Sequence, residues 1–503
     1  MGRSTRRCPS GASAVSEHEK SGRSAHKMKG MEYALWIGGN PVFTGRSRQV
    51  STPFDGEPVG TVCEASVEEV EQAVRAAEQT APTMASLKLY ERAAILRRAS
   101  ERLAERAEEM AQTISAESGK PLREARIEVQ RGVETLTFSA HEALRLAGEV
   151  VPMEASPAGA GHMAITVREP VGVIAAITPF NFPLNLALHK IGPAIAAGNA
   201  VVHKPASATP ITALRLAALL HECGLPPGAL NVIVGPGHLA GDALVTHPAV
   251  RMVTFTGSAD VGTRLQQRAG MKRVTLELGN NSAVIVEPDA DLDLAVPRCV
   301  TGSFANSGQV CISIQRIYVH KTIFDEFVRR FVERTEKLKI GHPLDPETEI
   351  SSLITPQDAD RILEWIDEAV KAGAQLLTGG RKLYRATVSP AVLTHVPSHV
   401  RLACQEAFGP VVAINPYADL DEAIRAVNDS PYGLQAGIYT RDLEKAFRAA
   451  RLVRVGGFMI NEIPQYRVDL MPYGGVKLSG LGREGPRYAI EEMTELKLIC
   501  WRV

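Results

Sequence analysis

One cysteine stands where it could act as a nucleophile. Cys311 closes the segment 304–311, in which Gly308 and Gln309 follow an apolar, helix-like stretch. A free cysteine is usually a small buried core residue. A glycine just before it permits a tight turn that exposes the sulfur, and a thiolate can attack a carbonyl carbon and hold the acyl group as a thioester. The pattern therefore indicates a candidate catalytic thiol.

A carboxylate upstream could serve as the base for such chemistry. Glu277 lies in the alternating segment 274–279, which puts its side chain on the opposite face from Leu276 and Leu278. A carboxylate at a strand end is usually solvated or ion-paired. At the carboxyl edge of a parallel sheet, however, it lies where ligands bind. A partly desolvated Glu277 could then activate water to attack a thioester.

Asn181 is a candidate oxyanion donor. It lies in the segment 178–183, where two prolines bracket a turn between a buried strand and a helix. Asparagine in a turn is usually only a turn former. In this position its amide could also donate a hydrogen bond to a developing oxyanion.

A glycine-rich element could bind a pyrophosphate. The segment 255–262 has two glycines in a GxxxxG pattern between a strand and a helix, and it lacks the GxGxxG spacing of the usual Rossmann fingerprint. Its backbone N–H groups would still lie at a helix N-terminus, where anions bind.

The elements that must position these residues alternate between strand and helix from Pro170 onward, which predicts a parallel sheet with helices on both faces. We expect strands at 171–178, 200–204, 230–234 and 251–256, and helices at 184–198, 211–223, 238–245 and 260–269. The upstream region 66–146 is mostly amphipathic helix and is expected to pack on that sheet.

A second alternating stretch runs from 282 to about 461 and predicts another α/β unit, with helices at 290–306, 321–338, 357–372, 420–428 and 442–452. Two segments fit neither unit. The segment 148–167 has strand character at both ends, and 495–503 alternates like an exposed strand. An exposed terminal strand needs an edge to pair with, which favours an oligomer.

The overall numbers exclude several classes of protein. A chain of 503 residues exceeds the ~250–300 at which single cores usually divide, so we expect two or three domains. The 56 basic and 56 acidic residues cancel, which argues against nucleic acid as a partner. No CxxC pair occurs among the seven cysteines, so no metal site is expected, and their odd number suits a reducing cytoplasm. No apolar run approaches the ~20 residues of a membrane span.

Residues 1–30 differ from the rest of the chain. They are rich in Ser, Gly, Arg and Lys and lack the apolar stretch of a secretory signal. An organelle transit peptide is one interpretation, although Glu17 and Glu19 argue against it. We favour a disordered tail, with translation starting effectively at Met28 or Met31.

Together these elements resemble the aldehyde dehydrogenase superfamily, from about Met31 to the C-terminus. The further segments that carry the resemblance are 203–207, 231–237, 406–410 and 472–485. The resemblance implies an α/β, aldehyde dehydrogenase-like fold. It would have a Rossmann-type cofactor domain (31–147 and 169–279), a second α/β catalytic domain (280–471) and a small β oligomerisation arm (148–168 and 486–503).

The resemblance also implies roles for single residues. Cys311 would be the nucleophile, Glu277 the base, and Asn181 an oxyanion donor beside the Cys311 backbone N–H, with Lys190 as a further catalytic residue and Asn461 in a supporting position. The cofactor would be NAD or NADP, bound by Thr178, Pro179, Lys204, Ser207, Gly237, Gly257, Ser258, Gly279, Glu406 and Phe408. Lys204 would contact the adenosine ribose, Ser258 the pyrophosphate, Glu406 the nicotinamide ribose and Phe408 the nicotinamide.

Two residues depart from the family pattern. Asn280 stands where many members have a second glycine, and asparagine is the next most tolerant residue for a left-handed conformation. Its added side chain is expected beside the base and the nicotinamide. Ser207 stands where members committed to NAD often have a glutamate. Because no anion there would repel a 2′-phosphate, we expect NADP to be accepted.

The substrate pocket is expected to comprise Phe182, His189, Arg467 and Tyr473. Arg467 could bind a carboxylate or phosphate through two hydrogen bonds. The alternative is a surface arginine that pairs with Asp469. His189 and Asn185 suggest a polar pocket.

Arg126 and Arg131, on the helix that follows the segment 119–122, could add positive charge to the pocket. The segments 187–192, 311–316 and 467–475 resemble the lactaldehyde dehydrogenase-like branch, which is associated with lactaldehyde and succinate semialdehyde.

We therefore expect oxidation of a small hydroxylated or anionic aldehyde to its acid, in a cytoplasmic homo-oligomer (a dimer or a dimer of dimers). A CoA-acylating enzyme is the first alternative, although such relatives generally lack the base at position 277. A crystallin-like binding protein is the second, and it predicts loss of Cys311, Glu277 or Asn181, which are all present.

Overall fold

A computed structural model describes residues 30–503, so nearly all of the expected disordered tail lies outside the described residues. The first of its two large sheets has eight strands in the order β22-β12-β11-β8-β9-β10-β2-β3. Their bounds are β2 (Leu35–Ile37), β3 (Asn40–Val42), β8 (Val173–Ile177), β9 (Ala200–Lys204), β10 (Leu230–Val232), β11 (Val250–Thr256), β12 (Arg273–Glu277) and β22 (Gly480–Leu481). The five strands from β12 to β10 are parallel, as the alternating pattern predicts.

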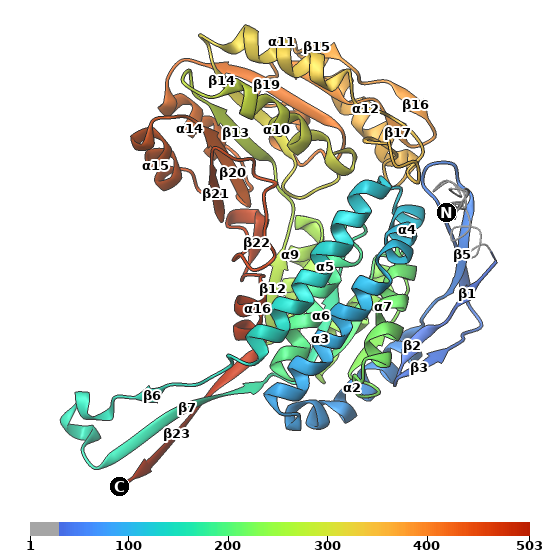
Figure 1. The fold of residues 1–503 in the computed structure, drawn as a ribbon, viewed down its shortest axis with the longest axis vertical. Helices are drawn as coiled ribbons and strands as arrows, with labels where there is room; N and C mark the ends of the chain where they lie inside the picture. Colours follow the sequence, from blue (N-terminus) through green and yellow to red (C-terminus); the bar gives the residue numbers. More distant parts are fainter. Residues whose placement is uncertain (1–29) are drawn as a thin grey trace, which may run out of the picture.

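Helices cover this sheet (Figure 1). Their bounds are α2 (Val67–Ser86), α3 (Leu89–Glu105), α4 (Ala107–Ser118), α5 (Leu122–Ala143), α6 (Asn185–Ala197), α7 (Pro210–Glu222), α8 (Asp242–Thr246), α9 (Ala259–Ala269) and α16 (Pro486–Glu492). Helix α5 packs against α3, α4, α6 and α16, whereas α8 packs against α2 and α9. The predicted helical region 66–146 is thereby confirmed.

The start of α6 is held by a buried carboxylate on α5. Glu128 accepts hydrogen bonds from the backbone N–H groups of Leu184, at 2.9 Å, and Asn185, at 3.1 Å. It also pairs with Lys120 at 2.5 Å, and both charged side chains are fully buried. The first N–H groups of a helix lack partners within the helix, and negative charge is favourable there. Glu128 therefore ties α5 to α6, the helix that carries Lys190.

The second sheet has seven strands in the order β15-β18-β19-β14-β13-β20-β21. Their bounds are β13 (Ser282–Val286), β14 (Ile314–His320), β15 (Gln375–Thr378), β18 (Ala391–Thr394), β19 (Val411–Tyr417), β20 (Gln435–Tyr439) and β21 (Gly457–Ile460). The helices of this part are α10 (Leu292–Phe304), α11 (Phe324–Thr335), α12 (Pro356–Lys371), α13 (Arg401–Cys404), α14 (Leu420–Asn428) and α15 (Leu443–Leu452). Both large sheets thus have the expected α/β character.

The C-terminal strand pairs within its own chain. β23 (Thr494–Arg502) runs antiparallel to β7 (His162–Pro170) along its whole length, and β6 (Val150–Val151) lies on the other side of β7. The terminal strand therefore has the edge that it needs within its own chain. The three strands project away from the main body (Figure 1), and apolar side chains such as Leu496 and Leu498 are exposed on β23.

The remaining strands form two small sheets: β1 (Glu32–Tyr33), β4 (Ser47–Ser51) and β5 (Pro58–Cys63) in one, and β16 (Lys382–Tyr384) and β17 (Thr387–Val388) in the other. Short helical turns occupy Met153–Ala155, Pro157–Gly159, Gly237–Gly241, Ala305–Gly308 and Lys477–Ser479. Within residues 30–503, every helix is too short or too polar to cross a membrane.

Candidate active site

The carboxyl edge of the first sheet brings the predicted residues together. β12 ends at Glu277, and β8 ends at Ile177, just before the turn that carries Asn181. Because β8, β11 and β12 are parallel and adjacent, both ends lie on the same edge of the sheet. In open parallel sheets this is the edge where ligands bind.

The turn that presents Cys311 is strained. Asn306, Ser307 and Gly308 have φ values of 49°, 55° and 75°, so three successive residues are left-handed. A Cβ atom on Gly308 would lie 2.0 Å from the Gly409 carbonyl oxygen, so only glycine fits there. Left-handed non-glycine residues cost about 1–3 kcal/mol each and persist where surrounding contacts hold them.

Those contacts come from the segment 351–354. The Ser307 hydroxyl donates to the Ser351 carbonyl at 3.1 Å and accepts from the Ser351 backbone N–H at 3.2 Å. The Gln309 side-chain oxygen accepts from the backbone N–H of Ile354 at 2.8 Å. The turn is therefore fastened on both sides of Gly308, and Cys311 is left partly exposed.

The thiol lies in a small apolar cluster beside one phenol. Val310, Ile312, Leu434 and Tyr473 surround it, and the Cys311 sulfur is 2.9 Å from the Tyr473 hydroxyl oxygen. Burial raises the pKa of the Cys311 thiol to about 12, although the Tyr473 hydrogen bond and the charge of Arg467 lower it. The thiol is therefore protonated at neutral pH and must lose its proton before it attacks.

Asn181 lies against the same turn. Its amide nitrogen donates to the Gln309 carbonyl at 2.9 Å, and its side-chain oxygen is buried with no hydrogen-bond partner. An amide nitrogen carries two hydrogens. One of them therefore anchors Asn181 close to Cys311, and the second is available for a negatively charged oxygen.

Glu277 is a buried carboxyl group without a hydrogen-bond partner. Its side chain is 2% exposed, and neither of its oxygens has a partner. Burial, followed by the charge of Glu484, raises the pKa of Glu277 well above its usual range, although Lys190 and Arg467 oppose this. A desolvated carboxyl with a raised pKa has the properties of a general base.

Glu484 is a residue that sequence reasoning did not single out. Its carboxylate contacts the Lys190 ammonium at 2.7 Å and the Arg467 guanidinium at 3.3 Å, and all three side chains are buried. Burial opposes ionisation, but these two cations hold the pKa of Glu484 well below its usual range. The segment 472–485 contributed to the family resemblance, but nothing in it indicates partners as distant as Lys190.

A cavity of about 270 Å³ lies at the N-terminus of α9. Six residues predicted to bind the cofactor line it: Thr178, Pro179, Lys204, Gly237, Gly257 and Ser258. Burial, together with the charge of Arg48, lowers the pKa of Lys204 to about 8. Ser207 is not among the lining residues, and its hydroxyl donates to the Gly235 carbonyl at 3.0 Å.

Gly279, Glu406 and Phe408 form a second group of predicted cofactor residues. A Cβ atom on Gly279 would lie 2.4 Å from a carboxylate oxygen of Glu406, so glycine allows this close approach. Burial raises the pKa of Glu406 to about 7, whereas a hydrogen bond from the Asn280 backbone N–H, at 2.9 Å, lowers it. The Phe408 ring meets Phe180 edge-on, with 5.8 Å between the ring centres.

The structure shows how Asn280 replaces the second glycine of the family pattern. The residue does not have a positive φ, so it needs none of glycine's conformational freedom. Its side-chain nitrogen donates to the Ser282 hydroxyl at 2.5 Å, and its oxygen accepts from the backbone N–H of Leu434 at 3.3 Å. The side chain is directed to β13 and the start of β20 because these polar partners are available there.

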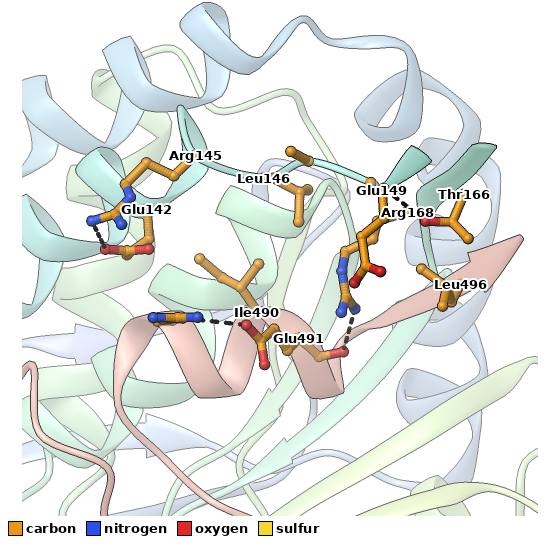
Figure 2. Close-up of a pocket in the computed structure, with 12 residues that line it drawn as sticks. Glu142, Arg145, Leu146, Glu149, Thr166, Arg168, Ile490, Glu491 and Leu496 are labelled. Carbon is orange, nitrogen blue, oxygen red and sulfur yellow. Dashed lines mark hydrogen bonds and ion pairs between the residues drawn. The ribbon is translucent and has the colours of Figure 1, made fainter. Parts of the chain in front are cut away.

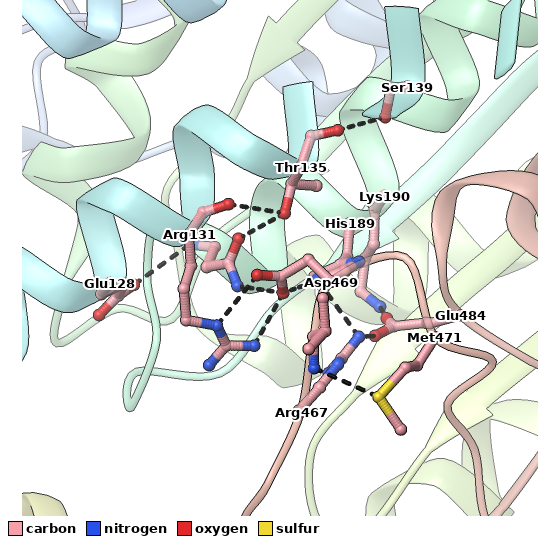
Figure 3. Close-up of polar contacts among 12 residues, drawn as sticks. Glu128, Arg131, Thr135, Ser139, His189, Lys190, Arg467, Asp469, Met471 and Glu484 are labelled. Atoms are coloured by element: carbon pink, nitrogen blue, oxygen red, sulfur yellow. Dashed lines mark hydrogen bonds and ion pairs between the residues drawn. The ribbon is translucent and has the colours of Figure 1, made fainter. Parts of the chain in front are cut away.

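Arg467 is not a surface residue paired with Asp469, so that alternative is wrong. Its side chain is 5% exposed, and its guanidinium lies 3.7 Å from the centre of the Tyr473 ring. It contacts Glu484 and, at 3.2 Å, the Nε2 atom of His189. Its Nε atom is buried without a partner. Figure 3 shows His189 between Arg467 and Asp469.

The other predicted pocket residues are divided between the site and the surface. Arg131 binds Asp469 through two hydrogen bonds, at 2.8 and 3.0 Å. Arg126 instead pairs with Glu108, and both side chains are about half exposed. Phe182 lies in contact with the cluster around Cys311, and the Lys120 ammonium is 3.7 Å from its ring centre.

A separate cavity of about 220 Å³ lies at the base of the projecting strands (Figure 2). Four of its charged side chains form ion pairs: Glu142 pairs with Arg145 at 3.4 Å, and Arg487 pairs with Glu491 at 3.3 Å. None of the predicted catalytic, cofactor or substrate residues lines it, so it is not the candidate active site.

The chain is similar over most of its length to known proteins. A model described as "Aldehyde dehydrogenase family" matches residues 43–499. The chain is 48% identical to the 3-sulfolactaldehyde dehydrogenase of Priestia aryabhattai, over 93% of this chain and 98% of the relative. It is 40% identical to the lactaldehyde dehydrogenase of Methanococcus aeolicus, over 90% and 96%.

Solved structures show the same fold. Aldehyde dehydrogenase 21 from Physcomitrella patens, in complex with the reaction product succinate, has a TM-score of 0.92 and 39% identity, over 94% of this chain and 99% of that one. GapN from Methanocaldococcus jannaschii with NADP has a TM-score of 0.88 and 38% identity, over 92% and 100%. Betaine aldehyde dehydrogenase from Staphylococcus aureus with NAD⁺ has a TM-score of 0.92 and 31% identity, over 96% and 97%. The predicted fold is confirmed.

The contact between Tyr473 and Cys311 predicts how the thiol will react. Because the Tyr473 hydrogen bond lowers the pKa of Cys311, Tyr473→Phe should raise this pKa further. Alkylation of Cys311 by iodoacetamide below its pKa should therefore slow about tenfold, and its pH profile should move upward. Tyr466→Phe, an exposed change on the same segment, is the control. Equal alkylation rates in the two variants would show that the phenol does not control the thiol.

Proposed function

The chain belongs to the aldehyde dehydrogenase family, and on that basis we propose that it oxidises a small aldehyde bearing an anionic group. It is an NAD(P)-dependent aldehyde dehydrogenase. The relatives carry the names of aldehyde dehydrogenases, and the CoA-acylating alternative has no support among them. The binding-protein alternative also has none.

The state of Arg467 carries the substrate proposal. A buried guanidinium whose Nε atom has no partner is a costly arrangement unless a ligand completes it. Its stacking on Tyr473 places it one side chain away from the Cys311 sulfur. A three-carbon or four-carbon aldehyde with a terminal sulfonate or carboxylate would span that separation. The names of two similar proteins, which refer to 3-sulfolactaldehyde and to the product succinate, agree with this class.

The cofactor cavity fits a dinucleotide. No side chain caps α9, so its first N–H groups are available to a pyrophosphate. Lys204 lines the cavity, and the buried Glu406 carboxylate, beside Gly279, could accept hydrogen bonds from ribose hydroxyls. When bound, the nicotinamide supplies the acceptor for the hydride that leaves the substrate carbon.

We assign the chemical steps to residues of this chain as follows. The Cys311 thiol gives its proton to solvent, the thiolate sulfur bonds to the aldehyde carbon, and the carbonyl oxygen becomes an oxyanion. The second amide hydrogen of Asn181 and the Cys311 backbone N–H stabilise that oxygen. After oxidation, Glu277 takes a proton from water. The resulting hydroxide attacks the thioester carbon, the carbon–sulfur bond breaks, and the proton held by Glu277 passes to the sulfur, so that the carboxylic acid and the free thiol are released. Lys190 keeps Glu484 charged, which in turn raises the basicity of Glu277.

The assembly and the compartment are part of the same proposal. The strands β6, β7 and β23 project from the body and expose apolar side chains, so we assign them to contacts in a homo-oligomer. The two large sheets would be the cofactor-binding and catalytic domains. Six cysteines within residues 30–503 are free, which suits a reducing compartment such as the cytoplasm.

Removing the proposed base should separate the two halves of the reaction. Glu277→Gln should still release one equivalent of NAD(P)H per site on mixing with aldehyde, because thiol addition and hydride transfer precede hydrolysis. Steady-state turnover should fall by about 10²–10⁴, the typical contribution of a general base. Stopped-flow absorbance measures both. Cys311→Ala should bind the cofactor but show neither burst nor turnover. Wild-type turnover in either variant would contradict the role assigned to the residue changed, Glu277 as the base or Cys311 as the nucleophile.

Changing Arg467 should alter which aldehyde is preferred. In Arg467→Met, the ratio of kcat/KM for succinate semialdehyde to that for propanal should fall about 30-fold or more, because a buried charge contact is lost. The ratio cancels effects on the thiol that both substrates share. Arg467→Lys, which keeps a positive charge, should retain part of the preference. An unchanged ratio in Arg467→Met would contradict the proposed anionic substrate.

The cofactor preference can be tested at Ser207. We propose that NADP is accepted because no carboxylate stands at this position near Lys204. Ser207→Glu should lower kcat/KM with NADP at least about tenfold relative to NAD, since the introduced anion repels the 2′-phosphate. Ser207→Gln, of similar size but neutral, should change the ratio little. A hundredfold preference of the wild-type enzyme for NAD would refute the proposal.

A further inference from the structure

Asp469 is a carboxylate that could neutralise Arg467 but does not. It lies two residues along the chain from Arg467, and its side chain is 1% exposed. Burial opposes its ionisation, yet the hydrogen bond from His189 and the charge of Arg131 hold the pKa of Asp469 well below its usual range. An ionised, buried carboxylate normally pairs with the nearest available cation.

Other donors already occupy this carboxylate. One oxygen accepts from Arg131 at 2.8 Å, from Asn185 at 3.0 Å and from His189 at 2.8 Å. The other oxygen accepts a second hydrogen bond from Arg131, at 3.0 Å. Arg131 thus supplies both arms of a bidentate contact, the strongest geometry available between arginine and a carboxylate.

Arg467 and Asp469 meet only through an imidazole. The Nε2 atom of His189 lies 2.8 Å from Asp469 and 3.2 Å from Arg467, so the two charged groups approach the same atom from different sides (Figure 3). Arg467 is left with a 3.3 Å contact to Glu484 and with an unpaired Nε atom. Burial lowers the pKa of Arg467, but the charges of Glu484, Tyr473 and Asp469 raise it, so Asp469 lies near enough to act on Arg467.

We propose that Arg131 is a positioning residue that holds Asp469 away from Arg467 and so keeps Arg467 available to the anionic group of the substrate. This inference rests on the proposed function. Arg131 comes from α5 and Asp469 from the loop before Tyr473, so the contact also fixes this loop against the helices. Within the Arg131 guanidinium, Nε and Nη2 are the two atoms that donate to Asp469.

A pair of variants separates this role from the alternatives. In Arg131→Met, Asp469 loses its bidentate partner and should turn to Arg467. The ratio of kcat/KM for succinate semialdehyde to that for propanal should then fall about tenfold, because Asp469 neutralises the charge of Arg467. Most of the fall should come from a higher KM for succinate semialdehyde. Adding Asp469→Asn to this variant removes the negative charge that neutralises Arg467 and should restore the ratio to within about threefold of wild type. Arg131→Lys should keep most of the preference.

Each other outcome overturns the inference. If the double variant stays as poor as Arg131→Met, Arg131 contacts the substrate directly or only supports the fold. If Arg131→Met leaves the ratio unchanged, Asp469 does not compete for Arg467. Arg126→Met is the matched control, because Arg126 lies on the same helix but pairs with Glu108. Thermal unfolding and propanal turnover of each variant report on folding.

The test also distinguishes failure of this inference from failure of the proposed function. If Arg467→Met lowers the substrate ratio but Arg131→Met does not, the proposal of an anionic substrate is supported and the proposed positioning role of Arg131 is wrong. If Arg467→Met has no effect on the ratio, the proposal of an anionic substrate is wrong, whatever the result for Arg131.

Discussion

The rest of the site depends on the ion pairs that the ionised carboxylate of Glu484 forms with two buried cations. Two buried cations, Lys190 and Arg467, come from distant parts of the chain and both contact it. Removing charges from water costs several kcal/mol per ion unless each finds a partner. Glu484 therefore draws α6 and the loop before Tyr473 together, and its charge raises the pKa of Glu277. Two neighbouring carboxyl groups are thereby separated into one that stays ionised and one that can exchange a proton, a division that acid–base catalysis requires.

The reacting thiol depends on a different constraint, which is steric. Its turn contains three left-handed residues and passes against the backbone of Gly409, so it exists only because the segment 351–354 and Asn181 hold it. Asn181 follows the first sheet and Cys311 precedes a strand of the second. The nucleophile and its proposed oxyanion donor therefore meet only when the two sheets are assembled. Strain of this kind gives a fixed direction to the sulfur, which suits an attack on a carbonyl carbon.

Much of the fold could be predicted from local patterns. The strands around β8, β9 and β11, and the helices between them, follow from apolar runs and their periods, because a buried strand and a buried helix each impose their own spacing. Cys311, Glu277 and Asn181 stood out for the same reason: each occupies a turn or strand end whose local sequence is informative. The surroundings of Asn280 and Arg467 could not be predicted in this way, because hydrogen-bond partners outside their own segments decide where their side chains point. For Asn280 these include Leu434, and for Arg467 His189 and Glu484.

The sequence by itself determined the α/β class, the family and the candidate nucleophile, since these depend on residue types at short, regular spacing. Only the tertiary structure decided the charge of the pocket. Asp469 is bound by Arg131 rather than by Arg467, and Glu484 by Lys190, over separations of hundreds of residues. Which carboxylate neutralises which cation is settled by proximity and burial, because the interaction between charges depends on distance and on the exclusion of water. The local order of the residues determines neither the distance between two charges nor the exclusion of water from them.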